Sequence, residues 1–292
     1  MSAIANSFPA VPTAFVVAIC ISLNFAAAAK PKRIVSTNVC ADQLVMLLAD
    51  PENIVSVSRL AAEPEVSNFS EQARSFHANG ARAEEIVQLR PDLVVGDVQT
   101  GKHANKLAKA IGVPVHIVDW PASISDVRQI VLRAGEAIGE PDRARKDVEE
   151  MTQRISRIET YAGIPLTALV YEPNGLTTGA GTLTDDLLRT AGLNNLASEL
   201  TGTSYGSVPL ERVIAAAPRL LILDDSYTRS SSRAQSLLRH PAFRALEGRT
   251  SLFRIPSRLW LCPGPWVAEA VERLADERRK LSTSLAPAAV SR

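Results

Sequence analysis

From residue 33 onward, short runs of branched aliphatic residues alternate with longer amphipathic segments. The short runs predict buried β-strands, and the longer segments repeat apolar residues at helical spacing. Alternating strands and helices are typical of parallel sheets. The alternation occurs in both halves of the chain, which predicts two α/β lobes. We expect strands at 33–37, 53–58, 93–97, 115–119, 167–173, 220–225 and 251–256, and helices at 41–50, 101–112, 123–139, 182–191, 209–217 and 265–281.

One phrase occurs twice, once in each half of the chain. EEIVQLRPDLVV at 84–95 and ERVIAAAPRLLI at 211–222 share Glu, Pro and Leu at the same spacing. Each copy predicts a short helix that ends before its proline, because proline disfavours helical geometry in the preceding residue, and then a buried strand. Glu84 and Glu211 lie in the first turns of these helices, where a carboxylate stabilises the helix dipole by up to about 1 kcal/mol. A purely structural role is therefore one interpretation of both glutamates.

Residues 141–163 connect the two halves. They place apolar residues at alternating spacings of four and three, which predicts one apolar stripe on a helix of about six turns. The segment is not rich in Gly or Ser, so a rigid bridging helix is favoured over a flexible linker, and a surface helix within one domain is the alternative. We expect an N-terminal lobe at 30–140, the bridging helix at 141–163 and a C-terminal lobe at 164–292.

The first residues of the chain differ from the rest. Residues 11–29 carry no charge and end in a run of alanines before Lys30, which predicts a signal peptide at 1–29. No Lys or Arg precedes the apolar run, so an uncleaved anchor is the alternative. Cleavage would remove Cys20 and leave Cys40 and Cys262 in an oxidising compartment, where paired thiols tend to form disulfides.

Composition narrows the class of partner. The 292 residues are 46% apolar and 22% charged, with a formal net charge of +1. This balance is typical of a soluble globular protein, and it provides no basic face for nucleic acid. We expect no nucleic-acid partner.

Several stretches, which cover nearly all of the chain after residue 30, match one known family: RIVSTN, EEIVQLRPDLVVG, IGVPVHIVD, LLRTAGLNNLASEL, SVPLERVIAAAPRLLIL and HPAFRALEGRTSLFRIPSRLWLCPGP. With them the chain resembles the substrate-binding proteins of ABC importers for cobalamin, haem and ferric siderophores, the class III periplasmic binding proteins. The resemblance implies two lobes bridged by one long helix, with a ligand cleft between them. It also implies a periplasmic monomer that delivers its ligand to a membrane permease dimer, without enzymatic activity or a resident cofactor.

The family also carries one surface glutamate per lobe that docks onto arginines of the permease. Glu84 and Glu211 match these positions by their place ahead of the proline and the strand. Carboxylates pair bidentately with guanidinium groups, which suits an orienting contact.

The resemblance places ligand contacts on loops at the strand ends, where open α/β sheets bind their ligands. In the N-terminal lobe it implies Thr37, Asn38 and Cys40, the segment 59–69 beginning with Arg59, and the segment 97–100 beginning with Asp97. In the C-terminal lobe it implies Tyr171, Glu172, Tyr205, Asp225, Ser226 and the segment 258–262 with Arg258, Trp260 and Cys262. An ordinary loop tyrosine at 205 and a core tryptophan at 260 are the alternatives.

Two departures from the family leave the ligand open. Ala78 stands where cobalamin binders carry an aromatic residue, and Ala81 stands near the place where haem binders carry a tyrosine. Arg59 and Arg258 would suit an anionic ferric chelate, because arginine recognises carboxylate-like oxygens. We expect a ferric siderophore or another iron complex, or a cobalamin-type ligand, with haem as an alternative. His77 is a lone histidine and is expected to be solvated.

Because the resemblance puts Cys40 and Cys262 on cleft-facing loops of opposite lobes, an interlobe disulfide between them is predicted. A pair of soft metal ligands is the rival interpretation, although no further His or Cys lies nearby in sequence to complete a set.

Two other classes of protein remain as alternatives. A secreted enzyme would use Asp224, Asp225 and Glu172 as acid and base, but the chain has no H-E-x-x-H or G-x-S-x-G motif. Gly179 and Gly181 form only part of a dinucleotide-binding pattern, since Thr184 stands where the third Gly belongs. A zinc- or manganese-binding protein of similar architecture is disfavoured by four scattered histidines.

Overall fold

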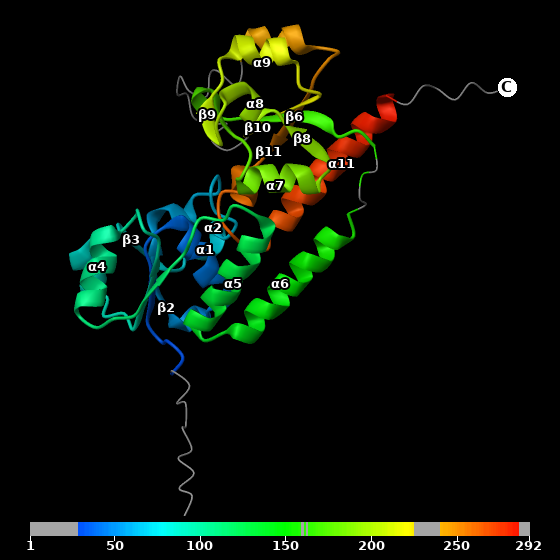
Figure 1. Ribbon diagram of the computed structural model, residues 1–292. Helices are drawn as coiled ribbons and strands as arrows, with labels where there is room; N and C mark the ends of the chain where they lie inside the picture. The colour runs from blue at the N-terminus through cyan, green and yellow to red at the C-terminus, as the bar shows by residue number, and fades with distance from the viewer. Residues whose placement is uncertain (1–28, 159–160, 162, 225–239, 286–292) are drawn as a thin grey trace, which may run out of the picture.

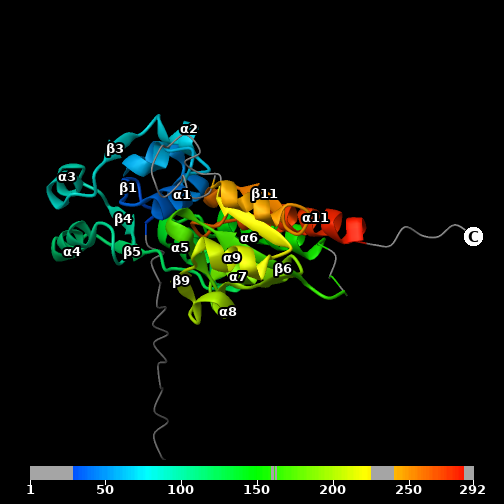
Figure 2. The same cartoon turned by 90° about the horizontal axis from the view of Figure 1, so that it is seen from above.

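The computed structural model describes residues 29–158, 161, 163–224 and 240–285. Figures 1 and 2 show two α/β lobes that meet along one side, with the N-terminal lobe in blue to green and the C-terminal lobe in green to red. This is the two-lobed fold with mainly parallel sheets that the alternating pattern predicts.

The N-terminal lobe contains a five-stranded sheet in the order β3-β2-β1-β4-β5, in which every pairing is parallel. Ile34 and Val95 face one apolar cluster, and Val35 and Val94 face another, because successive side chains of a strand point to opposite faces. Helices α1 and α5 cover the first face, and α3 and α4 cover the second. The strands are β1 (Ile34–Ser36), β2 (Ile54–Ser58), β3 (His77–Asn79), β4 (Leu93–Gly96) and β5 (Val115–Ile117), and the helices are α1 (Val39–Leu48), η1 (Pro51–Asn53), η2 (Arg59–Ala62), α2 (Ser70–Ala73), α3 (Ala83–Gln88), α4 (Lys102–Ala110) and α5 (Ile124–Ile138).

The C-terminal lobe contains a four-stranded parallel sheet in the order β11-β10-β6-β8 and an antiparallel pair, β7 with β9. Helices α7 and α11 cover one face of the larger sheet, and α9 and η5 cover the other. The strands are β6 (Leu166–Tyr171), β7 (Leu176–Thr178), β8 (Leu193–Asn195), β9 (Tyr205–Ser207), β10 (Leu220–Asp224) and β11 (Ser251–Ile255), and the helices are η3 (Pro173–Gly175), α7 (Leu183–Thr190), α8 (Ala197–Thr201), α9 (Leu210–Ala216), η5 (Pro241–Leu246), η6 (Ser257–Leu259) and α11 (Val267–Leu285).

The bridging helix is shorter than the apolar stripe predicts. Helix α6 begins at Pro141 as expected but ends at Ser156 instead of Gly163. It packs against α5 and against α11, and the Arg154 guanidinium makes two hydrogen bonds to the Glu272 carboxylate of α11, of 2.9 and 2.6 Å. None of the described helices is both long and apolar enough to cross a membrane.

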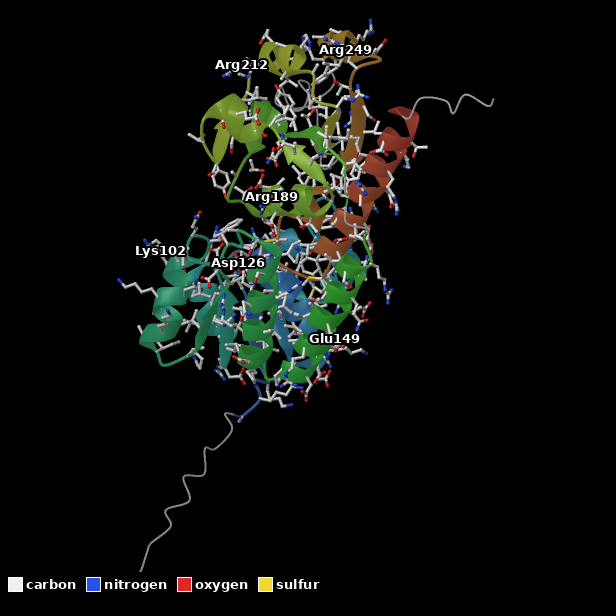
Figure 3. All side chains as sticks on the ribbon, turned by 45° about the vertical axis from the view of Figure 1, so that its right-hand side comes forward. Lys102, Asp126, Glu149, Arg189, Arg212 and Arg249 are labelled. Atoms are coloured by element: carbon white, nitrogen blue, oxygen red, sulfur yellow. A yellow bond between two sulfur atoms is a disulfide. The ribbon has the colours of Figure 1, made fainter. Side chains whose placement is uncertain are left out.

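One apolar cluster runs through both lobes. It contains residues of α1 and α5 from the N-terminal lobe together with residues of α7 and α11 from the C-terminal lobe. The junction is also polar, because the first backbone N–H of α5, at Ile124, donates to Asp186 of α7 over 2.8 Å. Figure 3 labels Asp126 and Arg189 on opposite sides of this junction. The two lobes therefore share a packed interface as well as a chain connection.

The repeated phrase forms the same joint in both lobes. Helix α3 leads through Arg90 and Pro91 to β4, and α9 leads through Ala217 and Pro218 to β10. Arg90 and Ala217 have φ values of 47° and 41°, which lie in the left-handed region. The helix thus ends before each proline, as predicted, and the residue before the proline adopts the conformation that usually favours glycine.

Candidate functional site

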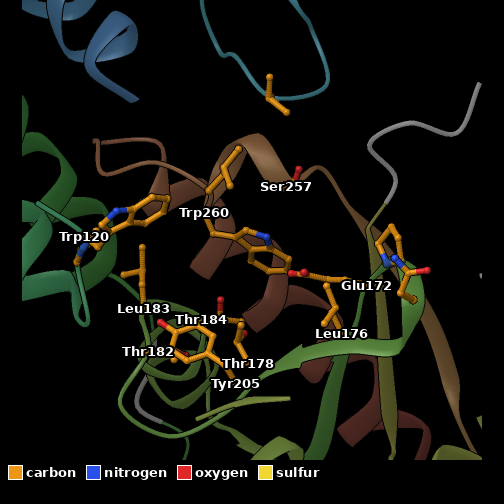
Figure 4. A pocket seen from close by; sticks show the side chains of 15 residues that line it. Trp120, Glu172, Leu176, Thr178, Thr182, Leu183, Thr184, Tyr205, Ser257 and Trp260 are labelled. Carbon is orange, nitrogen blue, oxygen red and sulfur yellow. The ribbon is translucent and has the colours of Figure 1, made fainter. Parts of the chain in front are cut away.

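A cleft with a volume of about 520 Å³ lies between the lobes (Figure 4). Its size is within the usual range for small-molecule sites, roughly 300–1,000 Å³. The N-terminal lobe contributes Val66 and the loop residues Trp120 and Pro121, which follow β5. The C-terminal lobe contributes the rest of the lining: Glu172, Pro173, Asn174, Leu176, Thr178, Thr182, Leu183, Thr184, Tyr205, Ser257, Trp260 and Leu261.

Three aromatic side chains dominate the cleft. Trp120 and Tyr205 are 58% and 70% exposed, whereas Trp260 is only 7% exposed and forms part of the wall. Figure 4 shows Trp120 and Trp260 on one side of the cleft and Tyr205 on another, with their rings near the open space. Large exposed aromatic rings in a concave site are unusual for a soluble protein and indicate a surface that a ligand covers.

The polar groups of the cleft are few. Among the described lining residues, Glu172 is the carboxylate and Tyr205 is the other titratable side chain; none is Arg, Lys or His. Thr182 caps α7, because its hydroxyl accepts from the Asp185 backbone N–H and donates to the Gly179 carbonyl. The described lining is therefore mainly apolar and carries no positive charge.

Three of the expected ligand contacts, Glu172, Tyr205 and Trp260, line the cleft. Val66 and Leu261 also line it, and they belong to the two segments, 59–69 and 258–262, that the family resemblance indicates.

The expected contacts at the end of β1 and β4 lie outside the described lining. Thr37 is buried between β1 and β4, and its hydroxyl lies 3.4 Å from the Val95 carbonyl. Asn38 caps α1 by accepting from the Ala41 N–H, and Asp97 accepts from the Gln99 and Thr100 N–H groups. Each of the three side chains thus makes a local hydrogen bond, and none of them belongs to the described lining.

Tyr171 lies beneath the cleft rather than in its lining. Its ring is fully buried and packs edge-to-face against Phe243, and its hydroxyl donates to the Val208 carbonyl over 3.2 Å. Burial raises the pKa of Tyr171, and the carboxylate of Glu211 adds to the increase. Tyr171 is a core residue that supports the β7 to β9 region.

Neither expected arginine belongs to the described lining. Arg59 is exposed on η2, and Arg258 is half-buried on η6, where its carbonyl accepts from Asn68. The described lining therefore gives no support to an arginine-lined cleft for a strongly anionic ligand.

Cys40 and Cys262 form a disulfide with a Cα–Cα distance of 5.0 Å across 222 residues of sequence. Cys40 is in α1, and Cys262 follows η6, next to the cleft residues Trp260 and Leu261. The two cysteines thus connect opposite lobes beside the cleft. The described residues contain no group of three or more His, Cys, Asp or Glu side chains placed to hold a metal ion.

The expected docking glutamates are both exposed, Glu84 on α3 of the N-terminal lobe and Glu211 on α9 of the C-terminal lobe. His77 is exposed at the start of β3. Asp225 and Ser226 lie outside the described residues, and for Asp224 only the backbone, at the end of β10, is described.

Sequence reasoning missed Trp120, Pro121 and the β7 to α7 residues of the lining. Trp120 follows the predicted strand at 115–119, so its position at the carboxyl end of a strand was a usable signal. Leu176 and Thr178 lie on β7, a three-residue strand that carries no clear periodicity.

The model of the periplasmic binding protein family matches residues 34–248, and the chain belongs to this family. Solved structures agree. The periplasmic haem-binding protein RhuT from Roseiflexus sp. RS-1 is 25% identical, with a TM-score of 0.70 over 86% of this chain and 99% of that protein.

Two further structures share the fold at lower identity. The vitamin B12 binding protein BtuF of Vibrio cholerae is 14% identical, with a TM-score of 0.64 over 86% of this chain and 98% of its own. A protein of an ABC-type Fe3+-hydroxamate transport system from Saccharomonospora viridis DSM 43017 is 19% identical, with a TM-score of 0.63 over 86% and 93%. A search of curated proteins found no match.

Proposed function

We propose that this chain is the substrate-binding component of an ABC importer, which captures a bulky metal chelate in the interlobe cleft and delivers it to a membrane permease. The observation that supports this proposal best is the cleft of about 520 Å³ with Trp120, Trp260 and Tyr205 around its open space. Aromatic rings bind flat apolar faces with a gain of about 0.5–1.5 kcal/mol per ring pair beyond the area that they bury.

The chemistry of the described lining supports some ligand classes more than others. It contains one carboxylate and no positive side chain, so a strongly anionic ferric chelate would lack a countercharge there. A corrinoid or a similarly flat, weakly charged chelate fits the aromatic and aliphatic surface better. A ferric siderophore of low net charge is the other ligand that we propose, and haem is the alternative.

Export and delivery complete the proposal. Residues 1–29 would act as a signal peptide that is cleaved near Lys30, so that the mature chain acts as a monomer in the periplasm. In the folded chain, Lys30 binds the Asp50 and Glu140 carboxylates, which holds the start of the N-terminal lobe in place. Glu84 and Glu211 would dock onto the permease dimer, one from each lobe.

A ligand panel tests the proposal. The mature chain is titrated with cyanocobalamin, a neutral ferric hydroxamate, an anionic ferric catecholate and hemin while tryptophan fluorescence and Tm are followed. We expect one class to quench the fluorescence and to raise Tm, since a ligand at 100 times its Kd stabilises the folded state by about 2.7 kcal/mol.

The same titration on variants locates the site. Trp120→Ala and Tyr205→Ala should each weaken binding by about tenfold, which corresponds to about 1.4 kcal/mol. Ile111→Ala, which removes an exposed apolar side chain outside the lining, should leave affinity unchanged. Absence of binding by all four chelates would contradict the proposed function.

A further inference from the structure

Residues 256–266, here called the crossing segment, leave the C-terminal sheet at the end of β11 and run to the start of α11. The segment carries Ser257, Trp260 and Leu261 of the cleft lining. It contains three prolines, and each fixes its own φ near −65°, which limits the bending of the segment. Trp266 stiffens it further, because its indole N–H donates to the Cys262 carbonyl over 2.9 Å and its ring lies over Gly264.

Although the crossing segment follows a strand of the C-terminal lobe, several contacts hold it to the N-terminal lobe. The disulfide joins Cys262 to Cys40 of α1. The Asn68 side-chain amide donates to the Arg258 carbonyl over 2.9 Å. The Phe69 ring packs edge-to-face on the Trp266 ring, with their centroids 6.0 Å apart.

Asn68 is itself held in place by α1. The Gln43 side-chain oxygen accepts from both the backbone and the side-chain N–H groups of Asn68, each over 2.8 Å. Gln43 is fully buried, and its amide also lies within 3.4 Å of the carbonyl of Val66, a lining residue. Helix α1 thus anchors Val66 directly and the crossing segment through two separate links, one covalent and one polar.

We propose that the Cys40–Cys262 disulfide and Asn68 are positioning groups for ligand binding, which hold Trp260 and Leu261 as a preset wall of the cleft against the N-terminal lobe. This inference rests on the proposed function of the cleft. A wall that is already in place avoids the entropy cost of ordering side chains when a ligand binds, so affinity depends on the anchors although neither touches the ligand.

The first test measures the free protein and needs no ligand. In a Trp120→Phe background, the two remaining tryptophans, Trp260 and Trp266, both lie in the crossing segment. We expect Cys40→Ser with Cys262→Ser, and separately Asn68→Ala, to increase acrylamide quenching of these tryptophans at temperatures well below Tm. Val213→Ala, a core change in the C-terminal lobe, lowers Tm but should leave quenching unchanged.

The second test measures affinity for the chelate that wild type binds in the panel of cyanocobalamin, ferric hydroxamate, ferric catecholate and hemin. We expect the double serine variant to bind it at least about tenfold more weakly and Asn68→Ala to bind it several-fold more weakly, mainly through faster dissociation. Asn68→Gln, which keeps the amide donor, should recover part of the loss. Val213→Ala should bind as wild type does.

Each outcome decides the inference. Two free thiols in the mass spectrum of the non-reduced mature chain, or affinities within about twofold of wild type for both sets of variants, would overturn it. If wild type binds none of the four chelates, the proposed function fails, and quenching alone then decides whether the anchors hold the crossing segment. If the serine variant does not fold, Asn68→Ala carries both measurements.

Discussion

At the scale of single residues, Asp42 on α1 is a fully buried carboxylate. Ser36 and Ser58 donate hydroxyl groups to it, and the Ser58 backbone N–H donates over 2.8 Å. These hydrogen bonds offset only part of the cost of burial, which raises the pKa of Asp42 from 3.8 to about 6. One pKa unit corresponds to about 1.36 kcal/mol, so the ionised carboxylate destabilises the folded state by about 3 kcal/mol above pH 6.

This pKa predicts how stability changes with pH. At pH values between 3.8 and about 6, the folded chain binds the proton of Asp42 more tightly than the unfolded chain does. The contribution of Asp42 to stability is therefore greatest below 3.8 and is lost as the pH rises through 6. Asp42→Asn keeps the shape and cannot titrate, so urea unfolding should show a smaller fall in stability between pH 4 and pH 7 than wild type shows. Equal falls in both proteins would contradict the prediction.

Asp50 provides the matched control, because Lys30 and Arg143 lower the pKa of its carboxyl. It is ionised in both the folded and the unfolded state above about pH 5. Asp50→Asn should therefore lower stability by a similar amount at pH 5 and at pH 7, without the slope that distinguishes Asp42.

At the scale of secondary-structure elements, the helix-to-strand joints store strain before their prolines. Ala217 has a φ of 41°, and a non-glycine residue in this region costs roughly 1–2 kcal/mol. Ala217→Gly relieves this cost. It also removes a half-buried methyl group and increases the entropy of the unfolded chain, and both effects lower stability. We therefore expect the free energy of unfolding to rise by less than about 1 kcal/mol. Thermal or urea unfolding measures the change.

Ala215→Gly is the control for this joint, since Ala215 is an exposed residue within the same helix. Glycine in a helix costs about 0.5–1 kcal/mol relative to alanine, so this variant should lower the free energy of unfolding. The two alanine-to-glycine changes, two positions apart, are therefore expected to change the free energy of unfolding in opposite directions. If both variants are destabilised to the same extent, the strain at Ala217 is not the dominant effect.

Elements with strong local patterns could be predicted from the sequence, and weakly patterned ones could not. Helix α5 has a Ser123 cap, an apolar stripe and a terminal Gly139, and it spans the predicted residues. Strands β3 and β9 contain three mainly polar or small residues each, and they form because neighbouring strands supply their hydrogen bonds. Helix α6 ends at Ser156 although the next residue of the apolar stripe, Ile158, still packs against the core, so apolar spacing alone did not set the end of the helix.

The side chains that line the cleft were harder to predict than the segments that carry them. The family resemblance indicated segments, and the structure decided which side chains within them face the open space. Tyr171 is the last residue of β6 and Trp260 follows η6, yet only Trp260 lines the cleft, because the ring of Tyr171 is buried in the core of the C-terminal lobe. Such a choice depends on packing between elements that are distant in sequence.

At the scale of the whole molecule, the lobes are joined more firmly than a single bridging helix would require. The disulfide closes a loop of 222 residues, which corresponds to roughly 5 kcal/mol of chain entropy removed from the unfolded state. Arg154 ties the bridging helix to Glu272 of the C-terminal lobe, and the hydrogen bond from Ile124 to Asp186 connects the lobes directly. A body with so many connections presents surface groups of both lobes at fixed separations, and the docking that we propose at two points of a permease would need such fixed separations.

Charge reversal at the two exposed glutamates tests that contact. Exposed ion pairs contribute only about 0–1 kcal/mol each, so Glu84→Lys or Glu211→Lys alone should weaken association with the cognate permease in lipid nanodiscs moderately. The double variant places like charges at both points and should abolish association and uptake, while ligand affinity stays that of wild type. Wild-type association should weaken as ionic strength rises. Glu149→Lys, the control, reverses an exposed charge on α6 and should leave association and uptake unchanged (Figure 3). Wild-type uptake by the double variant would refute the docking role, because the lobes would then be recognised through other residues.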